Sequence, residues 1–391
     1  MLVESPISKS PAWCSGGASV QASAVLMHLS LARNLADFPF PGRCTPEERR
    51  QVGRRVLTAL EDLDILSGGA HYALADLTSR EVRLLAERRL IVPAMLGERD
   101  GRSVFVSEDQ CLSIMINADD HLCLRLLAPG LRCEEGWQKL GQLDDRLTTA
   151  LDYAYDSKLG FLTASVDQVG TGLKAGMLLH LPCLREMGRL DEASGKVRHQ
   201  RFSLLGVKAG VNTEAAGKEH GRLSRRGAEE AKALSESLCS DIDGAVTGHL
   251  REALGDLFLL VNDRTLGQSE AEIAFHLRHQ AQDLLEDEAN ARESLLGATP
   301  VGLEDRIGRA RGIASGAHLL DFNEALEILS SLRLGVAGGF VTPGEVPLNA
   351  LLLRAQRAHL ELAIGDCQDA VALNTERARL FREHFTADEG Q

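Results

Sequence analysis

Short apolar runs joined by polar turns dominate the middle of this 391-residue chain. Strands that follow one another through short turns pair antiparallel, so these runs predict a mainly antiparallel sheet. A helical pattern from Glu134 to about Tyr155 interrupts the runs, which favours an α+β fold with helices packed on the sheet. The predicted strands are Ser103–Val106, Leu112–Ile116, Leu122–Leu127, Phe161–Val166, Met177–Leu181, Phe202–Val211 and Leu257–Val261.

Helical patterns come before and after the predicted strands in the sequence. Ala22 to about Val92 is predicted to be mostly helical, with helix starts at Thr45 and Thr78, each followed three residues later by Glu. Ser269 with Glu272 marks a further helix start. The predicted organisation is a mobile tail (1–20), a small helical N-terminal domain (21–100), the sheet domain (101–267) with a charged insertion (215–251), and a helical C-terminal domain (268–391).

Charge and cysteine usage narrow the class of protein. The net charge of -13 argues against nucleic-acid or anionic-membrane binding, which requires clustered Lys and Arg. The eight cysteines are scattered without a CxxC pair, which fits reduced thiols in a cytoplasmic protein and no metal site. The sequence contains no evident signal peptide and no apolar segment long enough to span a membrane.

Several short motifs occur in a specific order along the chain. They include Leu31–Asn34, the polar knot Asn117–His121, Gly170-Thr171-Gly172 and His180–Pro182. Together they resemble the ATP:guanido phosphotransferase (phosphagen kinase) family, most closely its bacterial branch, the protein-arginine kinases. The resemblance implies a small helical domain beside a large antiparallel sheet, and a C-terminal helical domain used for dimerisation and phosphoarginine recognition.

The resemblance also implies that arginines clamp the ATP phosphates. The positions that match those arginines are His28, Ser30, Cys123, Lys174 and Ala209, with Gly244 replacing Ala209 in an alternative alignment. Lys174 keeps a positive charge without the planar fork of arginine, and the others are not basic at neutral pH. One transition-state arginine contributes about 10³–10⁵ in rate, so the loss of four predicts that phosphotransfer is abolished.

The guanidinium side of the implied site is altered as well. Asp119 matches a catalytic glutamate, Glu214 or alternatively His249 matches the second one, and Ser165 matches the reactive cysteine. A serine hydroxyl does not ionise near neutral pH, and the sequence places no base beside Ser165. The C-terminal phosphoarginine motif aligns with Leu373–Ala378, which lacks the leading Arg-Asp pair.

Two hypotheses follow. In the first, the chain is a degenerate pseudokinase that binds no cofactor and acts as a scaffold, adaptor or regulator; its partner would be an active kinase paralogue or a stress-protease system. A homodimer through the C-terminal helices is part of this expectation. In the second, it is a divergent kinase that uses ATP and Mg²⁺, with Lys174, Asp119 and Glu214 as its core. Gly170-Thr171-Gly172 is either a structural turn or an anion cradle, an alternative that the sequence leaves open.

Overall fold

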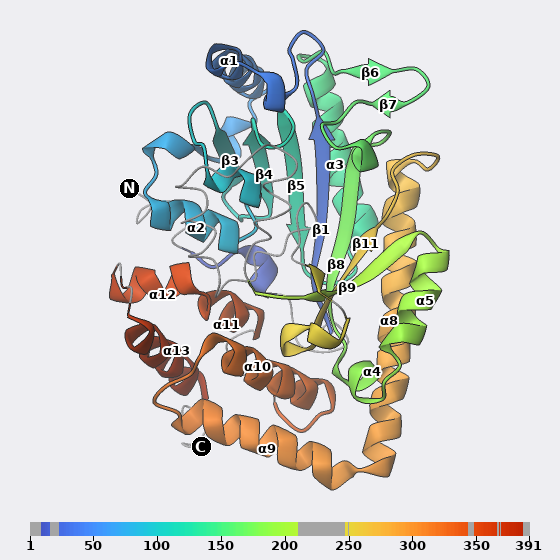
Figure 1. The fold of residues 1–391 in the computed structure, drawn as a ribbon, viewed down its shortest axis with the longest axis vertical. Helices are drawn as coiled ribbons and strands as arrows, with labels where there is room; N and C mark the ends of the chain where they lie inside the picture. Colours follow the sequence, from blue (N-terminus) through green and yellow to red (C-terminus); the bar gives the residue numbers. More distant parts are fainter. Residues whose placement is uncertain are drawn as a thin grey trace.

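The computed structural model describes residues 9–15, 23–209, 247–248, 250–342, 348–365, 367 and 369–385. Within these residues, nine strands form one sheet in the order β10-β9-β11-β8-β1-β5-β4-β3-β2, in which every neighbouring pair is antiparallel (Figure 1). The α+β prediction is therefore confirmed. The strands are β1 (Ala24–Arg33), β2 (Gly69–Ala73), β3 (Ser103–Ser107), β4 (Leu112–Ile116), β5 (Leu122–Ala128), β8 (Leu173–His180), β9 (Phe202–Val207), β10 (Thr247–Gly248) and β11 (Leu257–Asn262).

Strand β1 lies between β5 and β8 in the interior of the sheet. The prediction of a mostly helical segment from Ala22 to Val92 is wrong here and at β2. All ten residues of β1 are buried, so both of its faces are covered and the usual alternation of polar and apolar residues is weak. A continuous buried strand cannot be told from a buried helix by periodicity alone.

One face of the sheet is covered by α1 (Pro46–Asp62), α3 (Cys133–Thr148), α8 (Glu270–Ala298) and, against β9, α5 (Leu190–His199) (Figure 1). Leu29 and Leu31 of β1 lie in this core beside Leu140 of α3 and Leu277 of α8. Gly136 of α3 is needed for close packing, because a Cβ there would lie 2.7 Å from the Met27 side chain.

The three helix starts predicted from the sequence are confirmed. Capping boxes at Thr45, Thr78 and Ser269 begin α1, α2 (Ser79–Glu87) and α8. In each box the cap hydroxyl accepts a hydrogen bond from the glutamate amide three residues on, while the glutamate side chain accepts one from the cap amide. Local side-chain chemistry therefore sets where these helices start.

The opposite face of the sheet is covered by two separate groups of helices. Helix α2 packs on Val104, Val106, Met115 and Cys123. The C-terminal helices gather at one end of the sheet, where α10 and α11 pack on Leu26, Leu178 and Leu259 (Figure 1). These helices are α9 (Pro300–Gly316), α10 (Phe322–Ala337), α11 (Leu348–Arg354), α12 (Arg357–Ile364) and α13 (Ala370–Phe385).

Two predicted elements between β5 and β8 are shorter in the structure. Helix α3 ends at Thr148 rather than near Tyr155, since Ala36 and Ala154 bond the backbone of Asp152 and Asn34. The predicted strand Phe161–Val166 is wrong beyond Phe161. Only β7 (Gly160–Phe161) is extended, paired with β6 (Tyr155–Asp156), and the chain then forms a 3₁₀ turn at Val166–Gln168.

The C-terminal helices are joined to the sheet through buried polar contacts. Asp256, just before β11, accepts hydrogen bonds from Arg185 of α4 (Pro182–Glu186) at 2.8 Å, Arg306 of α9 at 3.1 Å and Ser330 of α10 at 2.5 Å. At the other end, Glu87 of α2 accepts from the amides of Ala358 and His359 at the start of α12, at 2.9 and 3.3 Å. The domain boundaries remain a prediction.

The insertion predicted at 215–251 lies outside the described residues apart from 247–248 and 250–251. Across the part of the chain that the structure describes, no helix is both long and apolar enough to cross a membrane.

Candidate functional site

A pocket of about 750 Å³ opens where the turn between β4 and β5 meets the segment before β8. Its lining includes Asp119, Ser165 and Lys174, three of the residues that the sequence analysis singled out. Phe38, Pro39 and Phe40 form an apolar side of the same pocket, and exposed Arg43 is a cation at its edge that the sequence analysis missed. The structure therefore brings together residues that are 55 positions apart in the sequence, from 119 to 174.

The polar knot between β4 and β5 is a hydrogen-bonded turn that fixes this pocket. Asn34 donates to the Asp120 carboxylate at 2.5 Å and accepts from the His121 amide at 2.9 Å. Asp120 also accepts from the Ala164 amide at 2.6 Å, which explains why the chain near 164 does not pair as a strand. Burial lowers the pKa of His121 to about 4, so its ring is neutral and structural. Asp119 is half-buried beside this turn.

The Gly170-Thr171-Gly172 turn is structural and offers no anion cradle. Its three amides donate to the carbonyl oxygens of Phe161, Thr265 and Gln168, at 3.1, 3.2 and 3.0 Å. Gly172 has φ +67°, and a Cβ there would lie 2.6 Å from the Ala32 carbonyl oxygen. The glycines are needed for close backbone approach, and their amides already have partners.

Arg33 at the end of β1 anchors this turn from beneath. Its guanidinium donates to Asp144 at 2.7 and 3.2 Å and to the Thr171 carbonyl oxygen at 2.7 Å, and only 1% of its side chain is exposed. The Phe161 ring centroid lies 3.5 Å from the guanidinium carbon, a cation–π contact. The arginine of the Leu-Ala-Arg-Asn match is therefore part of the scaffold.

Asp167 contacts both Ser165 and Lys174, the two polar side chains that would face a ligand in the pocket. It lies 3.4 Å from the Lys174 ammonium and accepts a hydrogen bond from the Ser165 hydroxyl. Burial alone raises the pKa of Asp167, but the Ser165 hydrogen bond and the Lys174 charge lower it overall. The prediction that no base lies beside Ser165 is therefore wrong, although a carboxylate with a lowered pKa is a weak base.

The other three positions expected to face phosphates form a buried, uncharged strip on β1 and β5. His28, Ser30 and Cys123 are 2%, 3% and 8% exposed, and the Ser30 oxygen lies 3.1 Å from the Cys123 sulfur. Burial lowers the pKa of His28 well below its usual value, helped by the charges of Arg125, Arg89 and Lys174, so the ring is neutral.

Two buried arginines, Arg89 and Arg125, lie beside this strip, and the sequence analysis did not single them out. Arg125 faces Ser30 across β1 and β5, two residues beyond Cys123 on the same side of the strand. Its guanidinium donates to the Arg89 carbonyl oxygen at 3.0 Å and to the Ser30 oxygen at 3.5 Å. Arg125 is fully buried, and it is not part of the pocket lining given by the described residues. The period-two alternation of the strand was the signal that could have found it.

The remaining predicted positions lie elsewhere. Ala209 follows β9 and packs on the core beneath the C-terminal helices, away from the pocket. Glu214, Gly244 and His249 lie outside the described residues. In the C-terminal motif, Arg377 is fully buried and donates to the carbonyl oxygens of Ala355 and Leu320, at 2.9 and 3.0 Å. Arg377 is therefore a structural side chain.

These residues do not fit a bound triphosphate in the way the family resemblance implies. All five matching positions lie in the described residues: the His28 ring is neutral, Ser30, Cys123 and Ala209 have no basic side chain, and Lys174 is paired with Asp167. Within the same part of the chain, no group of three or more His, Cys, Asp or Glu side chains could hold a metal ion.

Comparisons with known proteins agree with the architecture. Residues 51–236 match the model of the ATP:guanido phosphotransferase C-terminal catalytic domain, and residues 300–391 match that of the protein-arginine kinase McsB C-terminal domain. Among solved structures, a lombricine kinase covers 74% of this chain and 72% of its own, with a TM-score of 0.53 at 19% identity. That likeness shows the fold.

Curated relatives match nearly the whole chain. The protein-arginine kinase of Symbiobacterium thermophilum is 32% identical over 95% of this chain and 96% of its own length. The protein-arginine kinase of Syntrophomonas wolfei is 33% identical, with 97% and 96% covered. From these matches and the fold, the chain belongs to the protein-arginine kinase family of ATP:guanido phosphotransferases.

Proposed function

We propose that this chain has kept the guanido-kinase fold without phosphotransfer, and that it works by binding protein. The observation that carries this proposal is the neutral strip of His28, Ser30 and Cys123 at the positions where the family resemblance implies phosphate-binding arginines. A triphosphate placed there would gain from these three side chains no charge-assisted hydrogen bonds, each worth about 1.5–3 kcal/mol.

The contrast between the residues that hold the pocket together and those that would act on a substrate supports the same proposal. Arg33, Asn34, Asp120 and His121 form the buried network that holds the pocket together. The residues that would act on a substrate are changed in type, as Ser165 is, or neutralised, as Lys174 is by Asp167. Preserving a fold while losing its reaction is expected of a protein that contributes a surface. The proposed partner class is an active kinase paralogue or a component of a stress-protease system.

Retained ATP-dependent phosphorylation of protein arginine is the second candidate. The printed names of the relatives favour it, since they are protein-arginine kinases along almost their full length. One structural observation also favours it: Arg89, Arg125 and Lys174 all lie close enough to His28 to lower its pKa. In this candidate those cations would hold the phosphates in place of the missing arginines.

A thermal-shift titration separates the two candidates. With Mg-ATP or Mg-ADP, the unfolding midpoint of this chain should not move, whereas an active relative run beside it should be stabilised. Ligand at about 100 times its Kd stabilises a native protein by about 2.7 kcal/mol, so even a weak nucleotide site would be seen. Arginine and phosphoarginine are titrated in the same series, because a chain that does not bind nucleotide can still bind a guanidino group.

The variant Lys174→Ala makes the outcome specific to the pocket. A midpoint shift with Mg-ATP that Lys174→Ala abolishes and Lys174→Arg retains would support the second candidate and overturn the first. Lys174 pairs with Asp167 near the surface, with 16% and 58% of the side chains exposed, so its removal should cost little stability.

A further inference from the structure

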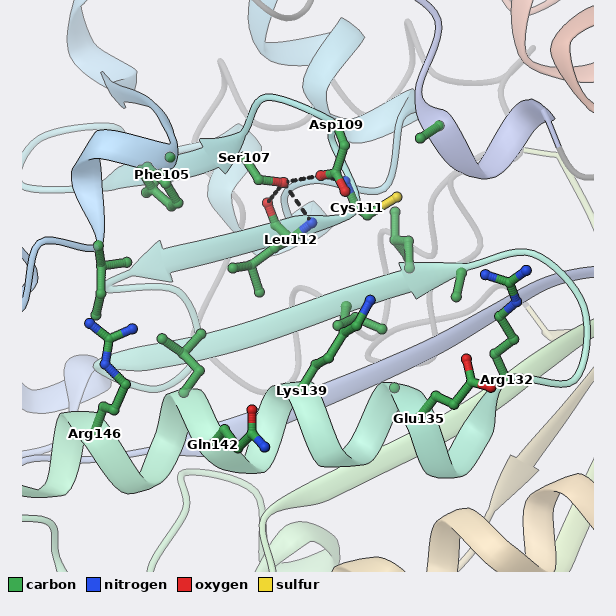
Figure 2. A pocket seen from close by; sticks show the side chains of 18 of the residues that line it. Phe105, Ser107, Asp109, Cys111, Leu112, Arg132, Glu135, Lys139, Gln142 and Arg146 are labelled. Atoms are coloured by element: carbon green, nitrogen blue, oxygen red, sulfur yellow. Dashed lines mark hydrogen bonds between the residues drawn. The ribbon is translucent and has the colours of Figure 1, made fainter.

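A second pocket, of about 660 Å³, lies on the opposite side of the sheet from the neutral strip, between α3 and the turn joining β3 to β4 (Figure 2). Its floor is apolar and comes from the strands: Phe105, Leu112 and Leu126 line it and lie in the core that α3 shares. None of the motifs in the sequence analysis falls on it. Its volume is within the range of about 300–1,000 Å³ that is typical of ligand-binding pockets.

The wall formed by α3 carries a row of cations. Arg132, just before α3, and Lys139 and Arg146 on α3 are spaced by seven residues, about two helical turns, and all three line the pocket (Figure 2). At about 1.5 Å per residue, neighbouring cations in this row are roughly 10 Å apart along the helix. All three are exposed. Within the described residues none of them forms an ion pair with a carboxylate, and Arg146 donates instead to the Leu63 carbonyl oxygen.

The opposite wall carries the opposite charge. Asp109 lies on the turn between β3 and β4, where it accepts hydrogen bonds from the Ser107 hydroxyl at 2.5 Å and the Cys111 amide at 2.9 Å. Asp64, after α1, lines the pocket next to Leu63, whose carbonyl oxygen Arg146 bonds, and Glu135 is the one acidic residue of α3 in the lining of described residues. The pocket thus has an apolar floor, a mainly basic wall along α3 and an acidic group, Asp109, across from it.

We propose that this pocket docks an amphipathic helix of a partner protein whose flank facing α3 is acidic. Large apolar side chains of the partner would enter the floor, and carboxylates seven residues apart would meet Arg132, Lys139 and Arg146. A helix lying beside α3 keeps the same rise per residue, so its carboxylates stay in register with the whole row. A basic side chain on its other flank would face Asp109.

The charge of the whole molecule confines an acidic partner to this row of cations. The net charge is -13, so an acidic partner is repelled by most of the surface and attracted at this row of cations. Complementary charge of this kind fixes position and orientation more than it adds affinity. The proposal does not depend on whether phosphotransfer is lost, because its test measures binding of a peptide and not of a nucleotide.

The test is selection of displayed 16-residue peptides on the full-length chain, with counter-selection on Arg132→Glu/Lys139→Glu/Arg146→Glu. Enriched peptides should combine large apolar residues at helical spacing with Asp or Glu seven residues apart. In fluorescence anisotropy with a synthesised peptide, Lys139→Glu should weaken binding by at least about 10-fold, and added salt should weaken it further.

Two matched variants keep the test decisive. Arg311→Glu reverses an exposed charge on α9, far from the pocket lining, and should leave the affinity unchanged. Leu112→Ala removes a half-buried floor side chain and should weaken binding several-fold at any salt concentration. Enrichment of basic peptides, no enriched peptides, or equal affinity for wild type and Lys139→Glu would each overturn the proposal.

Discussion

Replacing Arg33 by methionine should lower the free energy of unfolding by about 3–5 kcal/mol, the cost of leaving a buried charge without its partner. The variant leaves Asp144, 9% exposed, without the guanidinium that donates to it at 2.7 Å. It also removes the hydrogen bond that holds the Thr171 carbonyl oxygen at 2.7 Å. Domains are commonly stable by only about 5–15 kcal/mol, so the effect is large. Urea denaturation followed by circular dichroism measures it.

A double-mutant cycle shows whether the effect comes from this ion pair. Arg33→Met with Asp144→Asn should be less destabilised than the sum of the two single variants, because neither charge is then left unpaired. Arg54→Met is the matched control: Arg54 pairs with Glu47 on the surface, at side-chain exposures of 64% and 55%, and its loss should cost less than about 1 kcal/mol. Equal effects of Arg33→Met and Arg54→Met would contradict the scaffold role of Arg33.

Replacing Asp256 by asparagine should destabilise the junction between the sheet and the C-terminal helices by about 3 kcal/mol. The carboxylate, 6% exposed, receives Arg185 and Arg306 from two different helices. Asparagine keeps the shape and tolerates the left-handed backbone at this residue, φ +53°. The change removes the charge and turns one of the two accepting oxygens into a donor.

Limited proteolysis adds a spatial test to the stability measurement for Asp256. Cleavage in α9 and α10 should increase before cleavage in β1 or β5, because the lost contacts join those helices to the sheet. Glu186→Gln is the control: Glu186 lies 3.4 Å from Arg306 at the surface, and its loss should leave both readouts near wild type. Unchanged stability of Asp256→Asn would contradict the view that this carboxylate links the two parts.

Local chemistry was predictable from the sequence where side chains act within a few residues. The three capping boxes fall in this group, since each depends on neighbours in the chain. The side chains of the turn between β4 and β5 instead bond Asn34 and Ala164, which are far along the chain. Strand β1 was not predictable from periodicity, because it is buried on both faces and pairs with strands about 100 and 150 residues away, as in Leu29 with Leu126 and Ala175.

The candidate site was predictable only through the family resemblance, and in part. The resemblance brought Asp119, Ser165 and Lys174 into one expected site, and the structure places all three around one pocket. Comparing positions one by one missed Arg125, whose relevance depends on sharing a face of β5 with Cys123. It also missed that Asp167 would reach both Ser165 and Lys174, which depends on the 3₁₀ turn after β7.

Buried polar contacts hold the parts of the molecule together. Arg33 and Asp144 secure the turn before β8, Asp256 secures the C-terminal helices, and Glu87 secures α12 against α2. Under the proposed function, this frame presents the surfaces that bind partners. Arg33, which supports the fold, is present, whereas none of the positions expected to face phosphate carries arginine.

The rate of phosphotransfer is the measurement that tests this account most directly. Purified chain is incubated with Mg²⁺, γ-labelled ATP and an arginine-rich protein substrate, beside the protein-arginine kinase of Symbiobacterium thermophilum under the same conditions. The account predicts incorporation of label into arginine that is slower by at least about 10³-fold, since none of the five positions expected to carry arginine has one and only Lys174 among them keeps a positive charge. A rate within about tenfold of the active relative would contradict it.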